Sequence, residues 1–161
     1  MRRDEGGFSL IELLIVVAII LIIAAITVPN LIRSRIAANQ ASAIESMRVM
    51  GTAEITYSAT YGSGYSATLA MLGPPPTGTL SSASAAGLVD DLIASGSKSG
   101  YTFTYTPTLQ DSTGRYNGYI ILANPNVPGI SGSDYYYTDE THVIRMNSTA
   151  QAGSTDSYIA D

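Results

Sequence analysis

The chain has 161 residues, with 8 Lys and Arg against 13 Asp and Glu, a net charge of −5, one His and no Cys. The acidic balance argues against nucleic-acid binding through a basic patch, and the length is typical of one domain. The missing cysteines exclude disulfides, thiolate nucleophiles and cysteine-ligated zinc, and a single histidine excludes sites that need a His pair.

A nearly continuous apolar run occupies residues 8–28, after a short segment, residues 1–7, that begins with a basic pair. A helix of this length spans about 30 Å, the thickness of a hydrocarbon core. The run is longer than the apolar stretch of about 7–15 residues in a cleaved secretory signal. No convincing Ala-x-Ala site follows it, so the run predicts a membrane-spanning helix or the apolar core of a helical assembly.

Glu12 is a carboxylate inside this apolar run. Burying a charge in lipid costs about 2.5–3.5 kcal/mol on insertion scales, so Glu12 must lie near the interface, be protonated or be paired. One interpretation places it at the cytoplasmic interface. The other is that it accepts a cation from a second subunit, and both stay open on the residues alone.

The segment GFSLIE at residues 7–12, the apolar run and Pro29 together resemble the precursors of type IV pilin-like proteins, including the pseudopilins of type II secretion. The resemblance covers residues 1 to about 30. It implies that residues 1–7 are a leader, that a prepilin peptidase cuts after Gly7, that the new amino-terminal Phe8 is N-methylated, and that Glu12 guides assembly.

The residues themselves allow this chemistry. Gly7 has no side chain, so a protease can hold the backbone extended at the membrane surface. Cleavage would leave a positive amine on Phe8, four residues before Glu12 on one helix face. The amine of one subunit would then pair with the carboxylate of a neighbour and set the axial register.

Membrane orientation is nearly balanced by charge counting. Arg2 and Arg3 favour a cytoplasmic amino terminus under the positive-inside rule, and Arg33 and Arg35 oppose it. The resemblance implies a single-pass precursor in the cytoplasmic membrane, amino terminus inside and carboxyl terminus outside, and later an extracellular filament at the cell surface.

A second helical segment, residues 29–61, follows the apolar run. Pro29 lacks an N–H and is expected to kink or locally melt the helix. Apolar residues then recur at helical spacing, whereas Glu45, Arg48 and Glu54 fall off the stripe. The stripe residues are Ile36, Ala43, Met47, Met50, Tyr57 and Tyr61. We expect one long helix with an apolar first half, residues 8–28, and an amphipathic second half.

Residues 62–161 predict a β-rich head. Gly62 and Gly64 are expected to end the helix, residues 74–76 form a stiff proline connector, and residues 88–93 predict one short helical turn.

Four strands are expected after this loop, because the hydrophobic period changes to two. The first pair, residues 101–106 and 116–123, flanks a loop at 111–114, and the second pair, 135–138 and 143–146, flanks a turn at 139–142. The last fifteen residues are polar and predict a loosely packed tail. The sum is an α+β fold, a long helix packed on an antiparallel sheet of about four strands, which resembles the lollipop layout of pilins.

Evidence for catalysis or a cofactor is lacking in the sequence. His142 falls in a turn beside acidic residues, where a solvated surface role is expected. Asp134, Asp139 and Glu140 are candidate calcium ligands without an EF-hand pattern, and a solvated acidic turn is the preferred interpretation.

The function expected from these features is structural, not enzymatic: a type IV pilus subunit without a cofactor that polymerises with itself through its apolar helix. Its implied partners are the prepilin peptidase, an inner-membrane assembly platform, minor pilins and, before assembly, membrane lipid. A type II secretion pseudopilin is the alternative. A membrane-tethered binding module is a third possibility, which predicts that Gly7 is never cut and that Glu12 tolerates replacement.

Overall fold

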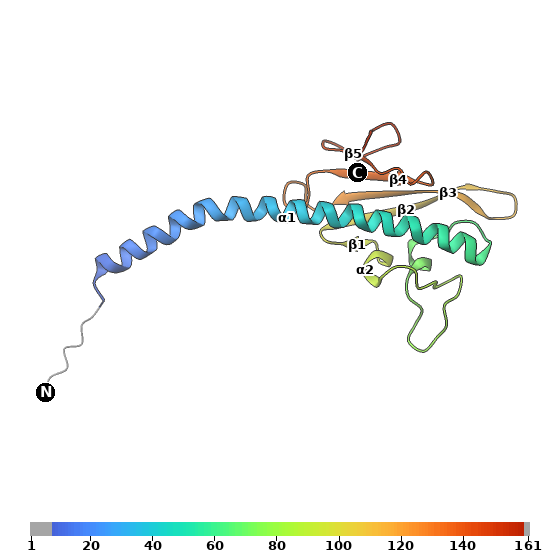
Figure 1. Cartoon of the computed structure of the whole chain (residues 1–161), viewed down its shortest axis with the longest axis horizontal. Coiled ribbons are helices and arrows are strands. Elements are labelled where there is room, and N and C mark those ends of the chain that lie inside the picture. The colour runs from blue at the N-terminus through green and yellow to red at the C-terminus, as the bar shows by residue number, and fades with distance from the viewer. Residues whose placement is uncertain (1–7, 160–161) are drawn as a thin grey trace. The chain divides into compact units, whose positions relative to one another are not determined.

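The computed structural model describes residues 8–159, which form one long helix and a six-stranded antiparallel sheet (Figure 1). Helix α1 spans Leu10–Tyr61, the 3-10 helix η1 spans Leu69–Leu72, and the short helix α2 spans Asp91–Ala94. The chain divides into two compact units at Arg35/Ile36. The amino-terminal unit contains the first part of α1, and the carboxyl-terminal unit contains its second part and the sheet.

The sheet follows the order of the sequence, with every neighbouring pair antiparallel. Its strands are β1 (Ser97–Lys98), β2 (Tyr101–Gln110), β3 (Tyr116–Pro125), β4 (Tyr135–Asp139), β5 (Arg145–Asn147) and β6 (Ser157–Tyr158). The register of the long central hairpin runs from Tyr101 opposite Pro125 to Gln110 opposite Tyr116. Both edge strands have only two residues, and short edges discourage pairing between sheets.

The α+β prediction is confirmed, but the sheet has two more strands than expected. The two additional strands, β1 and β6, have two residues each, which is too short to show a hydrophobic period in the sequence. The prediction of a loosely packed tail is wrong, because β6 pairs with β5 and Ala152 is buried. Asp156 holds this segment by accepting hydrogen bonds from the Asn147 side chain at 3.1 Å and from the Gly153 N–H at 2.8 Å.

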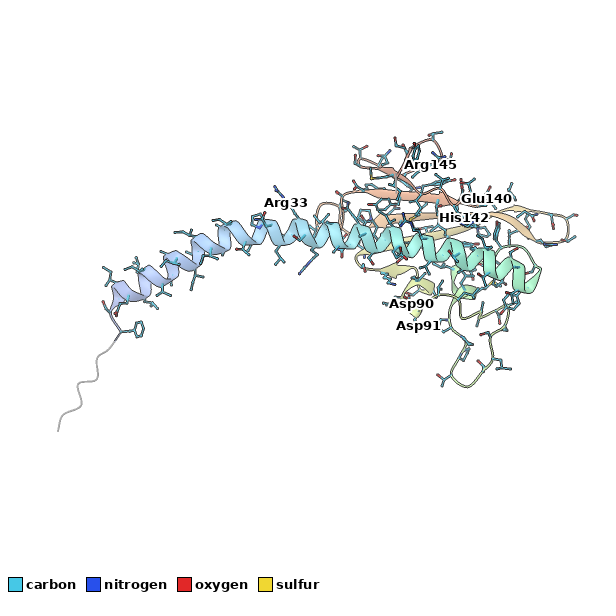
Figure 2. All side chains as sticks on the ribbon, viewed as in Figure 1. Arg33, Asp90, Asp91, Glu140, His142 and Arg145 are labelled. Carbon is cyan, nitrogen blue, oxygen red and sulfur yellow. The ribbon has the colours of Figure 1, made fainter. Side chains whose placement is uncertain are left out.

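Helix α2 begins at Asp91, about one turn after the start of the helical turn predicted at residues 88–93. Asp90 caps it by accepting the Ile93 N–H at 2.8 Å, and Lys98 donates to the same carboxylate at 2.8 Å. Figure 2 shows Asp90 beside Asp91 at the start of α2. The Lys98 hydrogen bond and the Ile93 N–H lower the pKa of Asp90, which is consistent with a charged cap.

The core lies between the second half of α1 and one face of the sheet (Figure 1). The predicted stripe is confirmed at its centre, where Ala43, Met47, Met50 and Tyr57 are buried, while Ile36 and Tyr61 are half-buried. The prediction that Glu54 points away from the core is wrong, since its side chain is 0% exposed. The sheet supplies the facing side chains: Tyr101, Phe103, Tyr119, Ile121, Ala123 and Tyr136.

Tyrosine supplies much of this core because its ring buries apolar area while its hydroxyl finds a partner. The hydroxyls of Tyr57, Tyr101 and Tyr105 donate to backbone carbonyls of Ala83, Asp134 and Ser66 at 2.8, 2.9 and 2.8 Å. The rings of Tyr105 and Tyr119 stack with centroids 5.9 Å apart. These bonds connect the helix, the loop after it and the sheet.

Alkaline pH should destabilise this core. Burial, aided by the charge of Asp134, raises the pKa of Tyr101 to about 12, and burial raises that of Tyr137 to about 12. The raised pKa in the folded state means that this stability is complete below pH ~10 and is lost as the pH rises toward 12. We expect tyrosinate absorbance and loss of circular dichroism to rise together above pH ~10. Full tyrosine ionisation near pH 10 with an unchanged fold would contradict this.

Gly64 allows the chain after α1 to approach β3. Its φ is +80°, the Tyr65 N–H donates to the Tyr116 carbonyl at 2.8 Å, and a Cβ on Gly64 would collide with that carbonyl oxygen. Gly62 has a similar φ of +63° but open space around it.

Gly64→Ala should therefore destabilise the fold more than Gly62→Ala. The left-handed conformation costs either variant about 1–2 kcal/mol, and overpacking against a backbone atom adds about 1–3 kcal/mol at Gly64 alone. Denaturant unfolding of the detergent-solubilised chain measures the difference. Equal losses in the two variants would show that the close approach to Tyr116 is not needed.

Candidate functional site

The first turn of α1 is closed by a hydrogen bond from Glu12. The Ser9 N–H donates to Oε2 of Glu12 at 2.9 Å, and the Ser9 carbonyl accepts the Leu13 N–H at 3.3 Å. This is one half of a capping box, in which an acidic residue at the third helical position satisfies the free N–H before the helix. A carboxylate in the first turn also interacts favourably with the helix dipole.

Sequence reasoning missed this cap, although the spacing Ser9-x-x-Glu12 is the recognised signature of a capping box. The carboxylate therefore has a partner within its own chain before any second subunit arrives. Phe8 is 85% exposed and Glu12 is also exposed, so both residues can be reached by another chain. Gly7 lies outside the described residues, and cleavage after it stays a prediction.

The helix that follows presents apolar side chains around its whole circumference. They are exposed over much of their surface from Phe8 to Ile32, and those of Leu10, Leu13, Leu14 and Val17 line a shallow hollow of about 290 Å³. By length and composition, α1 is the one helix among the described residues that could cross a membrane. A helix that is apolar all round requires lipid or other helices to cover it.

Pro29 lies inside α1, which continues through it as a helix. The turns around it contain two side chains that compete for backbone carbonyls: Thr27 Oγ1 donates to Ile23 O at 2.8 Å, and Ser34 Oγ donates to Asn30 O at 3.0 Å. Bonds of this kind and an internal proline both weaken a helix locally. A kink at Pro29 stays a prediction, and this cluster is where we expect it.

The three acidic residues considered as calcium ligands do not form one metal-binding group in the described part of the chain. Asp134 accepts a hydrogen bond from Gln40 Nε2 at 2.8 Å, before β4 begins. Asp139, at the other end of β4, accepts the Thr141 N–H at 3.0 Å and the Tyr137 hydroxyl at 3.0 Å. Burial acts to raise the pKa of Asp139, but these bonds outweigh it and lower the pKa. Within residues 8–159, no three His, Cys, Asp or Glu side chains form a group suited to a metal, and Glu140 joins no such group.

His142 is exposed, as expected, but it is also packed against α1. Its backbone is left-handed, with φ 60°, and its ring lies where a Cβ on Gly51 would be 2.6 Å from Nδ1. The same nitrogen is 3.3 Å from the Tyr119 hydroxyl. Figure 2 places His142 near Glu140 in the turn after β4. The residue thus fastens the β4–β5 turn to the helix.

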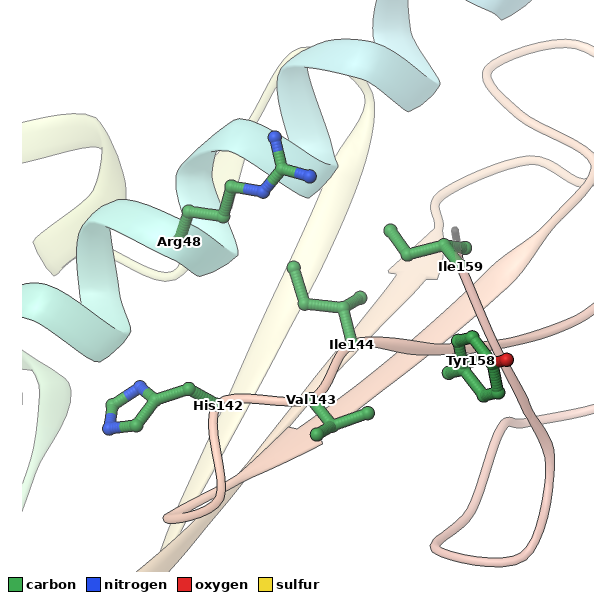
Figure 3. Close-up of a pocket in the computed structure, with 6 residues that line it drawn as sticks. All are labelled: Arg48, His142, Val143, Ile144, Tyr158 and Ile159. Carbon is green, nitrogen blue, oxygen red and sulfur yellow. The ribbon is translucent and has the colours of Figure 1, made fainter. Parts of the chain in front are cut away.

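A pocket of about 240 Å³ lies beside His142 (Figure 3). Its other lining residues are Arg48, Val143, Ile144, Tyr158 and Ile159. The described residues that line it include no carboxylate.

Glu54 is the polar residue that sequence reasoning placed wrongly. Its Oε2 accepts the Ser66 N–H at 2.9 Å, and its Oε1 accepts the Ser66 hydroxyl at 2.6 Å. Burial of the two side chains is the main cause that raises the pKa of Tyr105 and of Tyr119, and the negative charge of Glu54 raises both further. Glu54 lies four residues after Met50 and three before Tyr57, a spacing that places it on the buried face of the helix. The prediction gave more weight to its charge than to this spacing.

Comparison with known proteins agrees with the amino-terminal motif. Residues 2–28 match the family model of the prokaryotic N-terminal methylation motif. The chain is also similar to the type IV wide pilus major component PilA4 of Thermus thermophilus, with 60% identity over 37 residues. This match covers 23% of this chain and 28% of the relative, and no solved structure matches the chain.

The head therefore has no close counterpart among these matches, and the similarity is concentrated in the segment that contains the exposed apolar helix. The methylation motif, the pilin relative and the succession of a long apolar helix and an antiparallel sheet support the assignment of this chain to a type IV pilin-like family.

Proposed function

We propose that the chain is a structural subunit of a type IV pilus, stored in the cytoplasmic membrane and polymerised through its apolar helix. The observation that carries the proposal is a helix with exposed apolar side chains all round, whose first turn contains one carboxylate, Glu12, the last residue of the GFSLIE motif. In lipid this surface is already covered. Transfer to a filament therefore gains little from apolar burial, and packing and the Glu12 pair must favour assembly.

The proposed pathway starts with an amino-terminus-in precursor and cleavage by prepilin peptidase after Gly7. Methylation of the new amine on Phe8 follows, and an inner-membrane assembly platform with minor pilins then extracts the helix. The Phe8 amine of one subunit pairs with the Glu12 carboxylate of a neighbour, replacing the intrachain bond from Ser9. Pro29 and the hydroxyl bonds around it allow the helix to bend as it leaves the membrane.

The alternative is a type II secretion pseudopilin, which shares the same amino-terminal chemistry. Two observations favour the pilus. The relative matched by this chain is named as a major pilus component. The acidic side chains of the head, within the described residues, do not form a calcium group of the kind that some pseudopilins possess. The absence of cysteine departs from the disulfide loop common in major pilins and points the other way.

Intact mass and amino-terminal sequencing of protein sheared from cells test the proposal. A chain that begins at N-methylated Phe8 and is recovered in filaments is the expected result. Recovery of the same mature chain only in the cell envelope would favour the pseudopilin. A chain that begins at Met1 and stays in membranes would overturn both and indicate a tethered module.

A further inference from the structure

Within the carboxyl-terminal unit, an uncharged segment runs from the end of helix α1 toward α2 and the sheet. Residues 55–89 contain no Asp, Glu, Lys, Arg or His, although the chain has a net charge of −5. We call them the neutral segment. The segment lies between the buried Glu54 and the capping residue Asp90, and Figure 1 shows its loop projecting beyond η1 and α2. Between copies of an acidic protein, such a surface is where contact meets the least like-charge repulsion.

The neutral segment holds one leucine out in solvent. Leu80 is 92% exposed, the highest value of any large apolar side chain among the described residues. The loop that presents it is internally bonded: both the N–H and the hydroxyl of Thr79 donate to the Pro76 carbonyl, at 3.0 and 2.6 Å. Ser82 and Ala85 exchange two backbone hydrogen bonds at 3.0 Å. Leu80 is therefore held by a preformed loop, which lowers the entropy cost of binding.

A complementary pocket, which we call the tyrosine pocket, lies largely in the same segment. It has a volume of about 280 Å³, and its walls include Tyr57, Tyr65 and Tyr116. Its remaining lining residues are Ser63, Ala67, Met71, Ala83 and Gly114. None of these eight carries a charge, and six belong to the neutral segment. This volume lies just below the range of about 300–1,000 Å³ for ligand sites, a size that suits one side chain better than a larger ligand.

The tyrosine pocket is open to a side chain from outside its own copy. Leu80 does not line the pocket of its own chain and is exposed. Tyr57 is fixed by its bond to the Ala83 carbonyl at 2.8 Å, and Tyr65 by an edge-to-face contact with Tyr119 at 4.9 Å. Both tyrosine walls are therefore held in place before a partner arrives, which lowers the cost of binding.

We propose that the head self-associates through the neutral segment, with Leu80 of one copy inserted in the tyrosine pocket of a second copy. Residues 74–76 present the leucine. Electrostatics favour this surface, because residues 36–161 carry ten Asp and Glu against four Lys and Arg, a net charge of −6 on each copy, and all of these residues lie outside the neutral segment. The contact does not require cleavage after Gly7, so it is separable from the proposed pathway of assembly.

Disulfide cross-linking tests this contact directly, since the chain contains no cysteine. A full-length Leu80→Cys chain is mixed in detergent with a full-length Ala67→Cys chain of larger mass, and the mixture is oxidised. The matched control replaces Leu80→Cys by Leu109→Cys, which is 64% exposed and lies outside the neutral segment. We expect at least tenfold more mixed dimer from the Leu80→Cys pair than from the control pair.

Equal yields from the two pairs would overturn the proposal. Leu80→Asp provides a second measurement, because the site is exposed and the substitution should not disturb the fold. Sedimentation in detergent should show less self-association of this variant, and unchanged self-association would also overturn the contact. Filaments that form normally without the specific cross-link would overturn the contact and leave the pilus proposal intact. The specific cross-link together with a chain that cells never cut after Gly7 and never assemble into filaments would support the contact and remove the pilus.

Discussion

Glu12→Leu should abolish filament formation and leave membrane insertion unchanged. The substitution removes the cost of about 2.5–3.5 kcal/mol of a carboxylate in the apolar span, so the precursor should insert at least as well. In the assembled bundle it leaves the Phe8 amine of a neighbour without a partner. An unpaired charge in a low-dielectric bundle costs about 3–5 kcal/mol, which corresponds to a loss of filament yield of 100-fold or more.

The hydrogen bond between Glu12 and the Ser9 N–H makes a second variant necessary. Loss of a helix cap alone costs about 0.5–2 kcal/mol, and Glu12→Leu removes the cap and the charge together. Glu12→Gln retains an oxygen that can accept the Ser9 N–H at the same position but has no charge.

Yield of sheared filaments and membrane content are the two readouts for both variants. If pairing with the amine controls assembly, Glu12→Gln should assemble as poorly as Glu12→Leu. If capping controls it, Glu12→Gln should assemble normally. Normal filaments from Glu12→Leu would remove any role of this carboxylate.

Glu54→Ala should strongly destabilise the carboxyl-terminal unit. Glu54 is fully buried and accepts two hydrogen bonds from Ser66. The variant leaves the Ser66 N–H without its acceptor, at about 1–3 kcal/mol, and removes buried side-chain volume as well. We expect a total loss of about 3–5 kcal/mol, a large part of the stability of a domain of this size.

Ser66→Ala is the matched control, because it removes the hydroxyl donor but keeps the backbone N–H that bonds to Glu54. It should cost less, about 1–2 kcal/mol. Glu54→Gln retains an acceptor and should fall between the two. Denaturant unfolding of the detergent-solubilised chain provides the values. A loss below ~0.5 kcal/mol for Glu54→Ala would mean that the loop at Ser66 does not depend on this carboxylate.

Much of the amino-terminal half was predictable from local pattern. The apolar run from Phe8, the long helix to Tyr61 and the buried stripe at Met47 and Met50 follow from composition and helical period, which are properties of a short stretch of chain. The alternation around Phe103 predicted the β2–β3 hairpin for the same reason. The capping box at Ser9 and Glu12 was equally local and was available to sequence reasoning.

Tertiary packing decided the rest, because those features depend on residues far apart in the chain. The helical spacing places Glu54 on the buried face, but its charge can be buried because Ser66, beyond the end of the helix, supplies two donors, and the helix alone does not indicate these partners. The tail forms β6 because β5 offers it a free edge, and β1 exists only beside β2. The tyrosine pocket unites the last turn of α1, the neutral segment and the β2–β3 turn. Helical and strand periods report which face of an element is buried, and contacts between elements determine what meets there.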